Sequence, residues 1–344
     1  LTTGRLRDQW HGMSRTGTLG RLFGHVPEPV VQMHPQDIER RLLKDGDLVH
    51  VTSKRGSIVL PVQASTELGL SQAFIAMHWG SEYLGGVSST GEPLAGVNAL
   101  TTSAYCPSSK QPELKHAAVK ILKAELPWNL LAVAWLPAQD ALQVREELRQ
   151  LMARFPFATC VPFAGNASIA EAGIGQRSGV LFRAAAYEAA PDELLQRLEA
   201  LLALTGTDTL RYADRRRGQR RTVRVRREGA DTLVQGLLLA GDTSAEGWIR
   251  ALLQQELPAQ AYGRQLLAAG AKPPVAIAAA GKQVCSCFGV AAPAIEAQLA
   301  AGTGSADQRL ASLQGALRCG TNCGSCVPEL KRMVRAAMPV AQTA

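Results

Sequence analysis

Short apolar runs separated by polar, glycine-containing turns fill the first 120 residues. The runs at 48–51 and 58–62 flank a turn at 54–56 and predict a hairpin, because successive strand side chains point to opposite faces and glycine permits a tight turn. Two further runs, at 73–80 and 96–101, follow the same pattern. Many short strands between glycine-rich turns predict a closed β-barrel and not an open α/β sheet.

The middle third of the chain changes to longer elements. In order, the pattern predicts a buried strand, an amphipathic helix, a second strand and a second helix, at 128–136, 138–155, 179–186 and 191–204. This alternation is typical of a small α/β unit. Further strands are expected between 210 and 253, and the stretch 254–282, rich in Gln, Ala, Gly and Pro, is predicted to be a linker.

Three short helices are predicted near the end of the chain, at 292–301, at 306–317 and from Pro328 onward. A proline in the first turn, followed by Glu329, is typical of a helix start. Helices of this size bury little apolar surface by themselves, so we expect a metal centre to hold them together.

The composition is that of an ordinary globular protein. The chain has 344 residues, of which 46% are hydrophobic and 19% charged, and this length predicts roughly two to four domains. No apolar run is long enough to cross a membrane, so no membrane association is expected. The chain opens at Leu1 without a methionine, and we expect it to be the C-terminal part of a longer protein.

The net charge of +8 comes from one segment. Residues 211–227 contain nine arginines and one aspartate, and the rest of the chain sums to zero. Tyr212 is the only aromatic residue there, so no nucleic-acid partner is expected. The alternation after Gly218 predicts a half-exposed hairpin strand with Val223 and Val225 inward and the arginines outward. The alternative is a docking surface for an acidic partner such as a ferredoxin or a flavoprotein.

Four cysteines near the C-terminus carry the strongest chemical signal. They form the pairs Cys285-x-Cys287 and Cys323-x2-Cys326, which 35 residues separate and glycines flank. Two close pairs brought together by a fold offer four thiolates to one metal centre. Neighbouring glycines let backbone N–H groups approach the sulfurs, a recurring feature of iron–sulfur clusters.

Zinc and metal-free thiols are the alternatives to a cluster. Structural zinc favours cysteine pairs spaced by two to four residues, often with histidine. Here the first pair is C-x-C, and no histidine follows His116. Disulfides need an oxidising compartment, and redox-active or structural thiols are the third possibility. The spacing favours an iron–sulfur cluster over both.

The C-x-C pair and the later G-x-x-C-G-x-C-V-P segment resemble the [2Fe–2S] domain of the bacterioferritin-associated ferredoxin type. The resemblance implies a [2Fe–2S] cluster held by Cys285, Cys287, Cys323 and Cys326. It leaves Cys319, which lies just before the second pair, without a role.

The first seventeen residues are suited to a polar, flat, anionic ligand. They read LTTGRLRDQWHGMSRTG and mix glycine, hydroxyl, arginine, tryptophan and histidine residues without helical periodicity. Backbone N–H groups, hydroxyls and arginines bind phosphates, and Trp10 is placed to cover a ring.

Four segments, T-G-R…W-H, M-H-W-G, G-V-N-A-L-T and S-K-Q-P-E, occur in the order found in the C-terminal domain of molybdopterin oxidoreductases, which the first 120 residues resemble. The resemblance implies a double-psi β-barrel that binds part of a molybdenum-bis(molybdopterin guanine dinucleotide) cofactor. Cys106 stands where that family is expected to have aspartate. The implied cofactor contacts are Thr3, Gly4, Arg5, Trp10, His11, Gly12, His78, Trp79, Asn98 and Lys115.

Together, the two domains resemble the bacterial assimilatory nitrate reductases. The resemblance implies a cytoplasmic, molybdenum-dependent oxidoreductase that reduces nitrate to nitrite with electrons from a ferredoxin, a flavodoxin or an NADH-dependent reductase. The [4Fe–4S] cluster and the molybdenum ligands of that family are expected outside this sequence. We therefore expect no catalytic residue in this chain and no activity of the chain alone. The alternatives are a formate dehydrogenase type of molybdopterin oxidoreductase and a non-catalytic electron-transfer module.

The expected organisation is a multidomain α/β protein. The residues 210–253 resemble the C-terminal domain of pyridine-nucleotide-linked reductases, which implies a role in packing. The five expected parts are a molybdopterin dinucleotide-binding domain at 1–123, a small α/β domain at 124–206, a β-hairpin packing module at 207–256, a linker at 257–282 and a small helical [2Fe–2S]-binding domain at 283–340.

Overall fold

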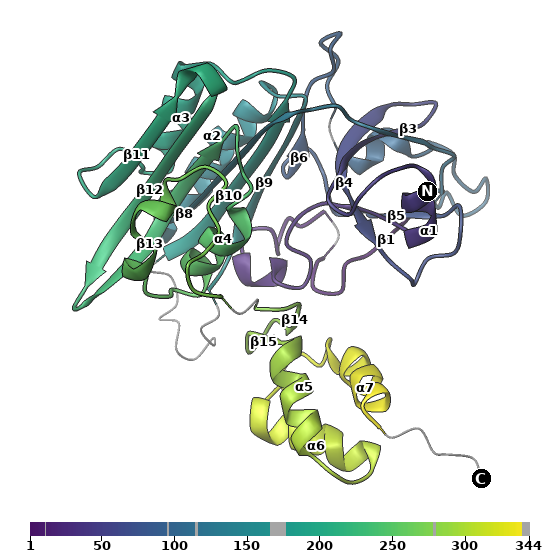
Figure 1. The fold of residues 1–344 in the computed structure, drawn as a ribbon. Helices are drawn as coiled ribbons and strands as arrows, with labels where there is room; N and C mark the ends of the chain where they lie inside the picture. The colour runs from purple at the N-terminus through teal and green to yellow at the C-terminus, as the bar shows by residue number, and fades with distance from the viewer. Residues whose placement is uncertain (11, 95, 114–115, 166–176, 278–279, 339–344) are drawn as a thin grey trace.

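The chain is a mixed α/β protein with several sheets, as expected. The computed structural model describes residues 1–10, 12–94, 96–113, 116–165, 177–277 and 280–338. Within these residues the strands form a six-stranded sheet, a seven-stranded sheet and a two-stranded hairpin. Figure 1 shows the two large sheets beside each other and a small helical unit at the C-terminal end of the chain.

The N-terminal residues form the six-stranded sheet, with the order β1-β5-β2-β4-β3-β7. β1 runs parallel to β5 and β2 parallel to β4, and the other neighbours are antiparallel. The hairpin expected around 54–56 is confirmed, since β3 and β4 flank it. The strands are β1 (Thr2–Gly4), β2 (Val31–Met33), β3 (Leu48–Thr52), β4 (Ser57–Ala64), β5 (Ala73–Ala76) and β7 (Lys120–Lys123).

The two edges of this sheet are brought together. Thr2 in β1 bridges to His116, and Leu1 and Ala117 exchange two backbone hydrogen bonds, shortly before β7 begins. The sheet therefore curves back on itself around an apolar interior. Short helical segments complete this part of the chain: η1 (Gly20–Phe23), α1 (Pro35–Arg40) and η2 (Val97–Leu100).

The middle of the chain forms the seven-stranded sheet, in which all neighbours are antiparallel. Its order is β11-β12-β13-β8-β10-β9-β6. The strands are β11 (Thr209–Asp214), β12 (Gln219–Glu228), β13 (Asp231–Ala240), β8 (Trp128–Pro137), β10 (Arg177–Ala186), β9 (Phe157–Phe163) and β6 (Leu84–Gly85).

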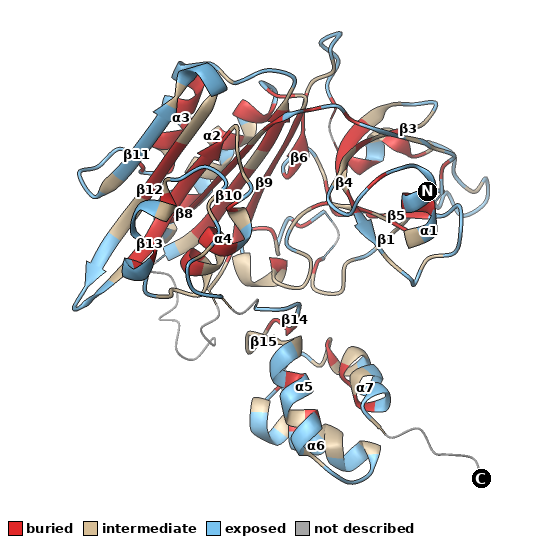
Figure 2. Cartoon of the chain, viewed as in Figure 1, coloured by how far each residue is buried: buried red, intermediate tan, exposed pale blue. Residues whose placement is uncertain are grey.

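Both faces of this sheet are covered by helices. α2 (Ala138–Met152) and α3 (Asp192–Leu201) pack on one face with Leu130 and Ala132 of β8. α4 (Glu246–Gln254) packs on the other face with Leu131 and Val133. A strand buried on both faces is apolar throughout, which explains the unbroken apolar run at 128–136. Figure 2 shows the resulting band of buried residues along the central strands.

This sheet crosses the domain boundaries expected from the sequence. β13 belongs to the module expected to begin at residue 207, yet it pairs with β8 of the preceding part. β6 lies in the first 123 residues and pairs with β9. The boundaries at 123 and 207 therefore do not separate independent sheets. β9 is not among the expected strands, because a short apolar run does not distinguish a strand from the end of a helix.

The first part of the expected linker is also packed. Tyr262, in η4 (Gln260–Leu266), stacks on Trp248 with ring centroids 5.6 Å apart, and Ala259 and Leu266 are buried. The polar and small residues around them hide these few apolar positions in the sequence. Residues 257–267 thus extend the core that α4 forms with the sheet.

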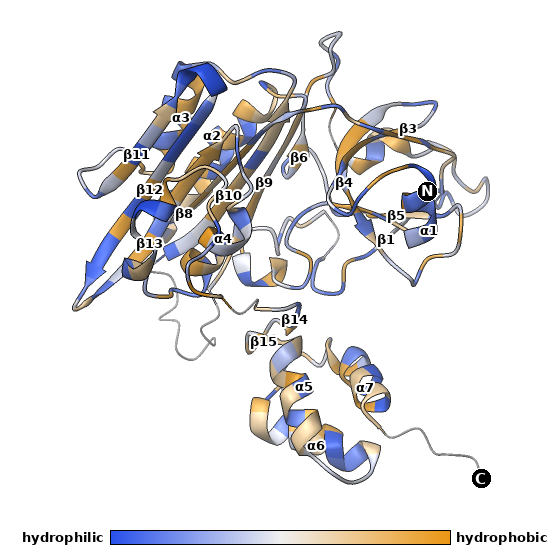
Figure 3. Ribbon diagram, viewed as in Figure 1, coloured by the Kyte–Doolittle hydropathy of each residue, from blue (hydrophilic) through white to orange (hydrophobic). Residues whose placement is uncertain are grey.

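The C-terminal unit has an apolar core of its own. Ile295, Leu299, Leu313 and Leu330 fill the space between its helices, and Figure 3 shows hydrophilic residues over much of α6 and α7. Two helices have the expected bounds, and the third begins one residue earlier than expected. The elements are β14 (Gln283–Cys285), β15 (Val290–Ala291), α5 (Ala292–Ala301), α6 (Ala306–Leu317) and α7 (Val327–Ala336).

Crossing a membrane takes a long and strongly apolar helix, and none of the helices in the described ranges has that combination.

Candidate functional site

Two loops carry the four cysteines to the same side of the C-terminal unit. Cys285 ends β14, and Cys287 lies in the turn before β15. Cys323 lies in the loop after α6, and Cys326 caps the start of α7. Gly324 between them has φ of +73°, a backbone conformation that favours glycine.

The four sulfurs are arranged in two pairs, each with one member from each loop. The Sγ atoms of Cys287 and Cys323 lie 3.3 Å apart, and the side chains of Cys285 and Cys326 are hydrogen-bonded to each other. Cys285 and Cys326 are buried, Cys287 is half-buried and Cys323 is exposed. One pair therefore lies inside the unit and the other near its surface.

The environment favours thiolate at one member of each pair. The hydrogen bond from Cys326 lowers the pKa of Cys285 to about 5, and the same bond together with burial raises the pKa of Cys326. At Cys323, partial burial acts to raise the pKa, but hydrogen bonds from Ser325 outweigh it and the pKa is lowered. Because thiolate is the form that binds metals, both pairs are prepared for ligation.

Cys319 differs from these four. Its side chain is fully buried, and its thiol donates a hydrogen bond of 3.6 Å to the carbonyl oxygen of Leu313 in α6. Burial raises the pKa of Cys319 to about 11. A neutral thiol engaged with a helix carbonyl has the character of a core residue and not of a metal ligand.

The two-pair arrangement suits a binuclear centre. A structural zinc site needs four ligands around a single ion, whereas four cysteines divide between two irons in a [2Fe–2S] cluster. The donor set and its division fit the cluster.

The N-terminal part of the chain contacts both cysteine loops through Arg7 and Asp8. Arg7 donates hydrogen bonds to Glu329 (2.6 Å) and to the carbonyl oxygen of Val284 (2.7 Å). Asp8 accepts hydrogen bonds from Ser286 and Ser325, one residue from each loop. Neither Arg7 nor Asp8 is among the cofactor contacts expected from the sequence.

A signal for these residues exists in the sequence. Asp8 is the only acidic residue among the first seventeen, and a serine lies inside each cysteine pair, in C-S-C and C-G-S-C. These features point to polar partners, but the contact itself joins positions 278 residues apart, which no local pattern can predict.

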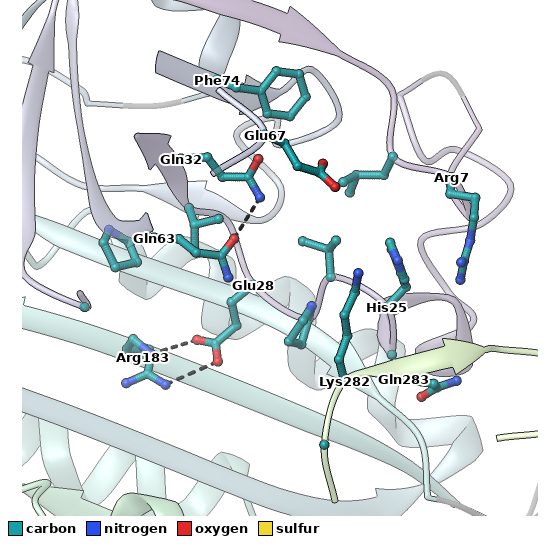
Figure 4. A pocket seen from close by; sticks show the side chains of 18 of the residues that line it. Arg7, His25, Glu28, Gln32, Gln63, Glu67, Phe74, Arg183, Lys282 and Gln283 are labelled. Atoms are coloured by element: carbon teal, nitrogen blue, oxygen red, sulfur yellow. Dashed lines mark hydrogen bonds and ion pairs between the residues drawn. The ribbon is translucent and has the colours of Figure 1, made fainter. Parts of the chain in front are cut away.

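A cavity of about 1190 Å³ lies where the three parts of the chain meet. Ligand pockets of drug-sized molecules are commonly about 300–1,000 Å³, so this one has room for a nucleotide-sized ligand. Figure 4 shows Arg7, His25 and Lys282 at one end and Glu28 with Arg183 at the other. Its wall includes Arg5 of the N-terminal segment and Ser325 of the second cysteine loop.

Glu28 fixes one side of this cavity. Its carboxylate binds Arg183 of β10 (2.7 Å) and Arg250 of α4 (2.9 Å). Burial acts to raise the pKa of Glu28, but the two guanidinium groups outweigh it and lower the pKa to about 2. Glu28 therefore remains ionised and ties the N-terminal segment to the seven-stranded sheet.

The expected cofactor contacts come from three segments that meet at one end of β5. Thr3 and Gly4 lie in β1 beside β5, and the carbonyl oxygen of Gly4 accepts a hydrogen bond from Met77 N. Two residues further on, the carbonyl oxygen of Trp79 accepts a hydrogen bond from Val97 N, next to Asn98. Sequence segments nearly a hundred positions apart are thus neighbours through the loop after β5.

The side chains of these expected contacts have different surroundings. Arg5, Trp10, Gly12 and Asn98 are exposed, and among the described residues Arg5 is the expected contact that lines the cavity. His11 and Lys115 lie outside the described residues.

The side chains of His78 and Trp79 are buried. Trp79 packs between Phe23 and Tyr83, with ring centroids 6.2 Å from each. It presents almost no surface to a ligand and belongs to the core.

The arginine-rich segment forms the expected hairpin, but its arginines do not all point outward. Arg221 in β12 is 1% exposed and binds Asp242 at 2.9 Å. The expectation of outward arginines is wrong at this position, because Arg221 shares the inner face with Val223 and the carboxylate of Asp242 neutralises it there. Several other arginines have partners within the chain: Arg215 and Arg220 bind Asp192, Arg217 binds Asp214 and Arg226 binds Glu228.

Two family models match the chain. The family described as Molydopterin dinucleotide binding domain matches residues 1–118, and the family described as BFD-like [2Fe-2S] binding domain matches residues 283–336.

Curated relatives match more of the chain. A protein of Klebsiella oxytoca named nitrate reductase is 30% identical over 347 aligned residues, which cover 98% of this chain and 34% of that protein. A nitrate reductase of Shewanella frigidimarina is 32% identical over 148 residues, 37% of this chain and 15% of that protein. The chain thus spans about a third of the length of the first relative. The solved structure of acetylene hydratase from Pelobacter acetylenicus is similar over 36% of this chain and 18% of the hydratase chain. The two are 18% identical there, and the TM-score is 0.29.

Proposed function

We propose that this chain, which joins a molybdopterin dinucleotide-binding domain to a BFD-like [2Fe–2S] domain, is the C-terminal portion of a molybdenum-dependent assimilatory nitrate reductase. The observation that carries the proposal is the 30% identity to a nitrate reductase across 98% of the chain. Similarity at that extent includes residues 119–282, which neither family model covers. It therefore supports the combination of domains and not only their separate presence.

In this proposal the C-terminal unit relays electrons. Cys285 and Cys326 would hold one iron, and Cys287 and Cys323 would hold the other, in line with the two sulfur pairs. The cluster supplies one-electron redox chemistry. The chain positions the ligands, keeps one pair away from water and leaves the exposed pair open to an incoming electron.

The N-terminal part binds a section of the molybdenum-bis(molybdopterin guanine dinucleotide) cofactor, within the double-psi barrel that the family resemblance implies. At His78 and Trp79 we assign the contact to the backbone, because the side chains are buried. The proposed contacts in the described residues are Thr3, Gly4, Arg5, Trp10, Gly12, His78, Trp79 and Asn98. Backbone groups and an exposed arginine suit phosphate oxygens.

The substrate, the donor and the location follow from the same resemblance. We propose that the whole protein reduces nitrate to nitrite in the cytoplasm. Electrons come from a ferredoxin, a flavodoxin or an NADH-dependent reductase. The [4Fe–4S] cluster and the catalytic residues lie in the N-terminal part of the whole protein, so this chain alone has no activity.

Two measurements test the proposal. The purified chain should contain about two irons and two acid-labile sulfides per molecule, as a [2Fe–2S] cluster requires, and zinc in their place would contradict the cluster assignment. The full-length protein should reduce nitrate with an artificial reductant and should not oxidise formate. Formate oxidation without nitrate reduction would point to the formate dehydrogenase type, and absence of both with a bound cluster would point to a non-catalytic electron-transfer module.

A further inference from the structure

One carboxylate of the N-terminal part touches both cysteine loops. Asp8 accepts hydrogen bonds from the hydroxyl of Ser286 and, at 3.2 Å, from the hydroxyl of Ser325. Ser286 lies between Cys285 and Cys287, and Ser325 directly precedes Cys326. Asp8 is therefore attached to each loop at a residue adjacent to the ligands.

The carboxylate of Asp8 is buried and charged. Its side chain is 5% exposed. Burial acts to raise the pKa of Asp8, but hydrogen bonds from Arg7 and Ser286 outweigh it and the pKa is lowered. A charge held in such a place is weakly screened by water and salt, so it acts on neighbouring charges more strongly than a surface charge does.

Arg7 supplies a positive charge in the same place. Its guanidinium binds Asp8 through two hydrogen bonds, of 3.0 and 3.1 Å, and reaches Glu329 of α7. Lys282 binds Glu329 at 2.7 Å, and His25 lies 3.2 Å from the same carboxylate. Two cations and two carboxylates therefore balance each other beside the loops, with His25 at the edge.

These charges act on one ligand of each sulfur pair. Asp8 interacts electrostatically with Cys323, and Arg7 with Cys326. The reduction potential of an iron–sulfur cluster depends on the net charge around it, on hydrogen bonds to its sulfurs and on its exposure to solvent. A negative charge nearby disfavours the added electron, and a positive charge favours it.

We propose that Asp8 and Arg7 are positioning residues that set the reduction potential of the cluster from the N-terminal part of the chain. The inference rests on the proposed function, since it takes the four cysteines to hold a [2Fe–2S] cluster. Reduction by one electron would make a cluster held by these cysteines more negative by one unit. Asp8 opposes that change and Arg7 assists it, so the potential depends on how the C-terminal unit docks.

Residues 5–8, which contact the C-terminal unit, also connect the cysteine loops to the cavity. Arg5, Leu6 and Arg7 line the cavity, and the next residue, Asp8, binds the two loops. A change in the position of residues 5–8 would therefore alter both the cavity wall and the contacts with the cysteine loops. The segment gives the cofactor-binding part a direct means of adjusting its electron relay.

The test is a redox titration of the purified chain with its [2Fe–2S] cluster, followed by visible absorbance and electron paramagnetic resonance. Asp8→Asn removes a negative charge at nearly constant volume and should move the midpoint potential to a more positive value. Arg7→Gln removes a positive charge and should move it to a more negative value. We expect each change to alter the equilibrium constant for reduction about tenfold, which is about 59 mV for a one-electron couple.

Two controls separate charge from loosening of the loops. Asp307→Asn makes the same change of charge at an exposed position in the first turn of α6 and should leave the potential unchanged. Ser286→Ala removes one hydrogen bond and no charge, and should shift the potential less than Asp8→Asn does.

The opposite signs of the two shifts decide the inference. Shifts of the same sign in Asp8→Asn and Arg7→Gln would show that lost contacts and not charge move the potential, and unchanged potentials would show that the residues only hold the domains together. Either result overturns the inference. The proposed function is unaffected by it as long as the wild-type chain binds a [2Fe–2S] cluster. If Asp8→Asn loses its cluster, Arg7→Gln decides, and an unchanged or raised potential there overturns the inference. A wild-type chain that binds no iron refutes the proposed function instead.

Discussion

The five cysteines of the C-terminal unit differ in what surrounds each sulfur. The pKa of Cys285 is lowered by its hydrogen bond with Cys326, and the pKa of Cys323 by its hydrogen bonds with Ser325 and Cys287. Cys319 has a raised pKa because it is buried and because Cys285 lies close to it. The lowered pKa values separate Cys285 and Cys323, two of the four proposed ligands, from Cys319.

Replacing single cysteines tests this separation. Cys323→Ser should abolish the visible absorbance of the cluster and lower the protection of residues 285–335 in hydrogen exchange, because metal binding supplies much of the folding energy of a small domain. Cys319→Ala should keep iron content and absorbance, with a loss of about 1 kcal/mol in stability from the small cavity. Iron loss in Cys319→Ala together with iron retention in Cys323→Ser would reverse the ligand assignment.

At this scale the sequence predicts donor atoms well and their partners poorly. The four cysteines proposed as ligands are recognisable because each pair is local, with one or two residues between its members. The serine contacts of Asp8 and the ion pair of Arg221 are not, since they depend on how strands and loops from distant segments meet.

Among the elements, Glu28 adds an ionic connection to the apolar core that the N-terminal segment shares with the middle sheet. Glu28 binds Arg183 in β10 and Arg250 in α4, and Glu246 of α4 shares both arginines. Most elements of this region are predictable from apolar periodicity, including β8, α2 and the helices of the C-terminal unit. Their pairing is not, because antiparallel partners such as β8 and β13 are a hundred residues apart and many registers bury similar apolar area.

Glu28→Gln should destabilise the chain, most strongly at neutral pH. The folded pKa of Glu28 is about 2 against an ordinary 4.5, so its contribution is complete above pH 4.5 and is lost as the pH falls towards 2. We expect a loss of about 1–3 kcal/mol at pH 7, since two arginines lose a partner but keep Glu246. Urea unfolding at pH 7 and pH 3 measures it, and the difference in stability between the variant and the wild type should be smaller at the lower pH.

Glu67→Gln is the matched control for that substitution. Glu67 pairs with Arg332, but both side chains are largely exposed, and such pairs contribute about 0–1 kcal/mol. Equal destabilisation by both substitutions would contradict the special role of Glu28.

In the whole molecule, the arginine-rich hairpin and the cluster unit are well separated. Figure 1 shows β11 and α3 at the far end of the seven-stranded sheet from α5, α6 and α7. The turn η3 (Arg215–Arg217) lies between β11 and β12, and Arg215 pairs with Asp192 at the start of α3. An electron donor that docks there would be remote from the cysteines.

We therefore expect the hairpin to play no part in electron delivery. Neutralising Arg215, Arg216 and Arg217 together should leave the rate of cluster reduction by an acidic donor such as a ferredoxin unchanged at low salt. Both rates are measured by stopped flow, and the rate of reduction by a small artificial reductant is the reference. A slower rate with the protein donor only, restored by salt, would instead identify the hairpin as a docking surface.

The separate core of the C-terminal unit has a consequence for how such proteins arise. Its apolar residues begin at Val284, and none of them belongs to the core of the two sheets. The contacts between them that involve Arg7, Asp8, Lys282 and Arg332 are polar. A gene fusion or deletion at this junction would leave no hole in either interior, so the unit is free to be gained, lost or exchanged as a single inherited module.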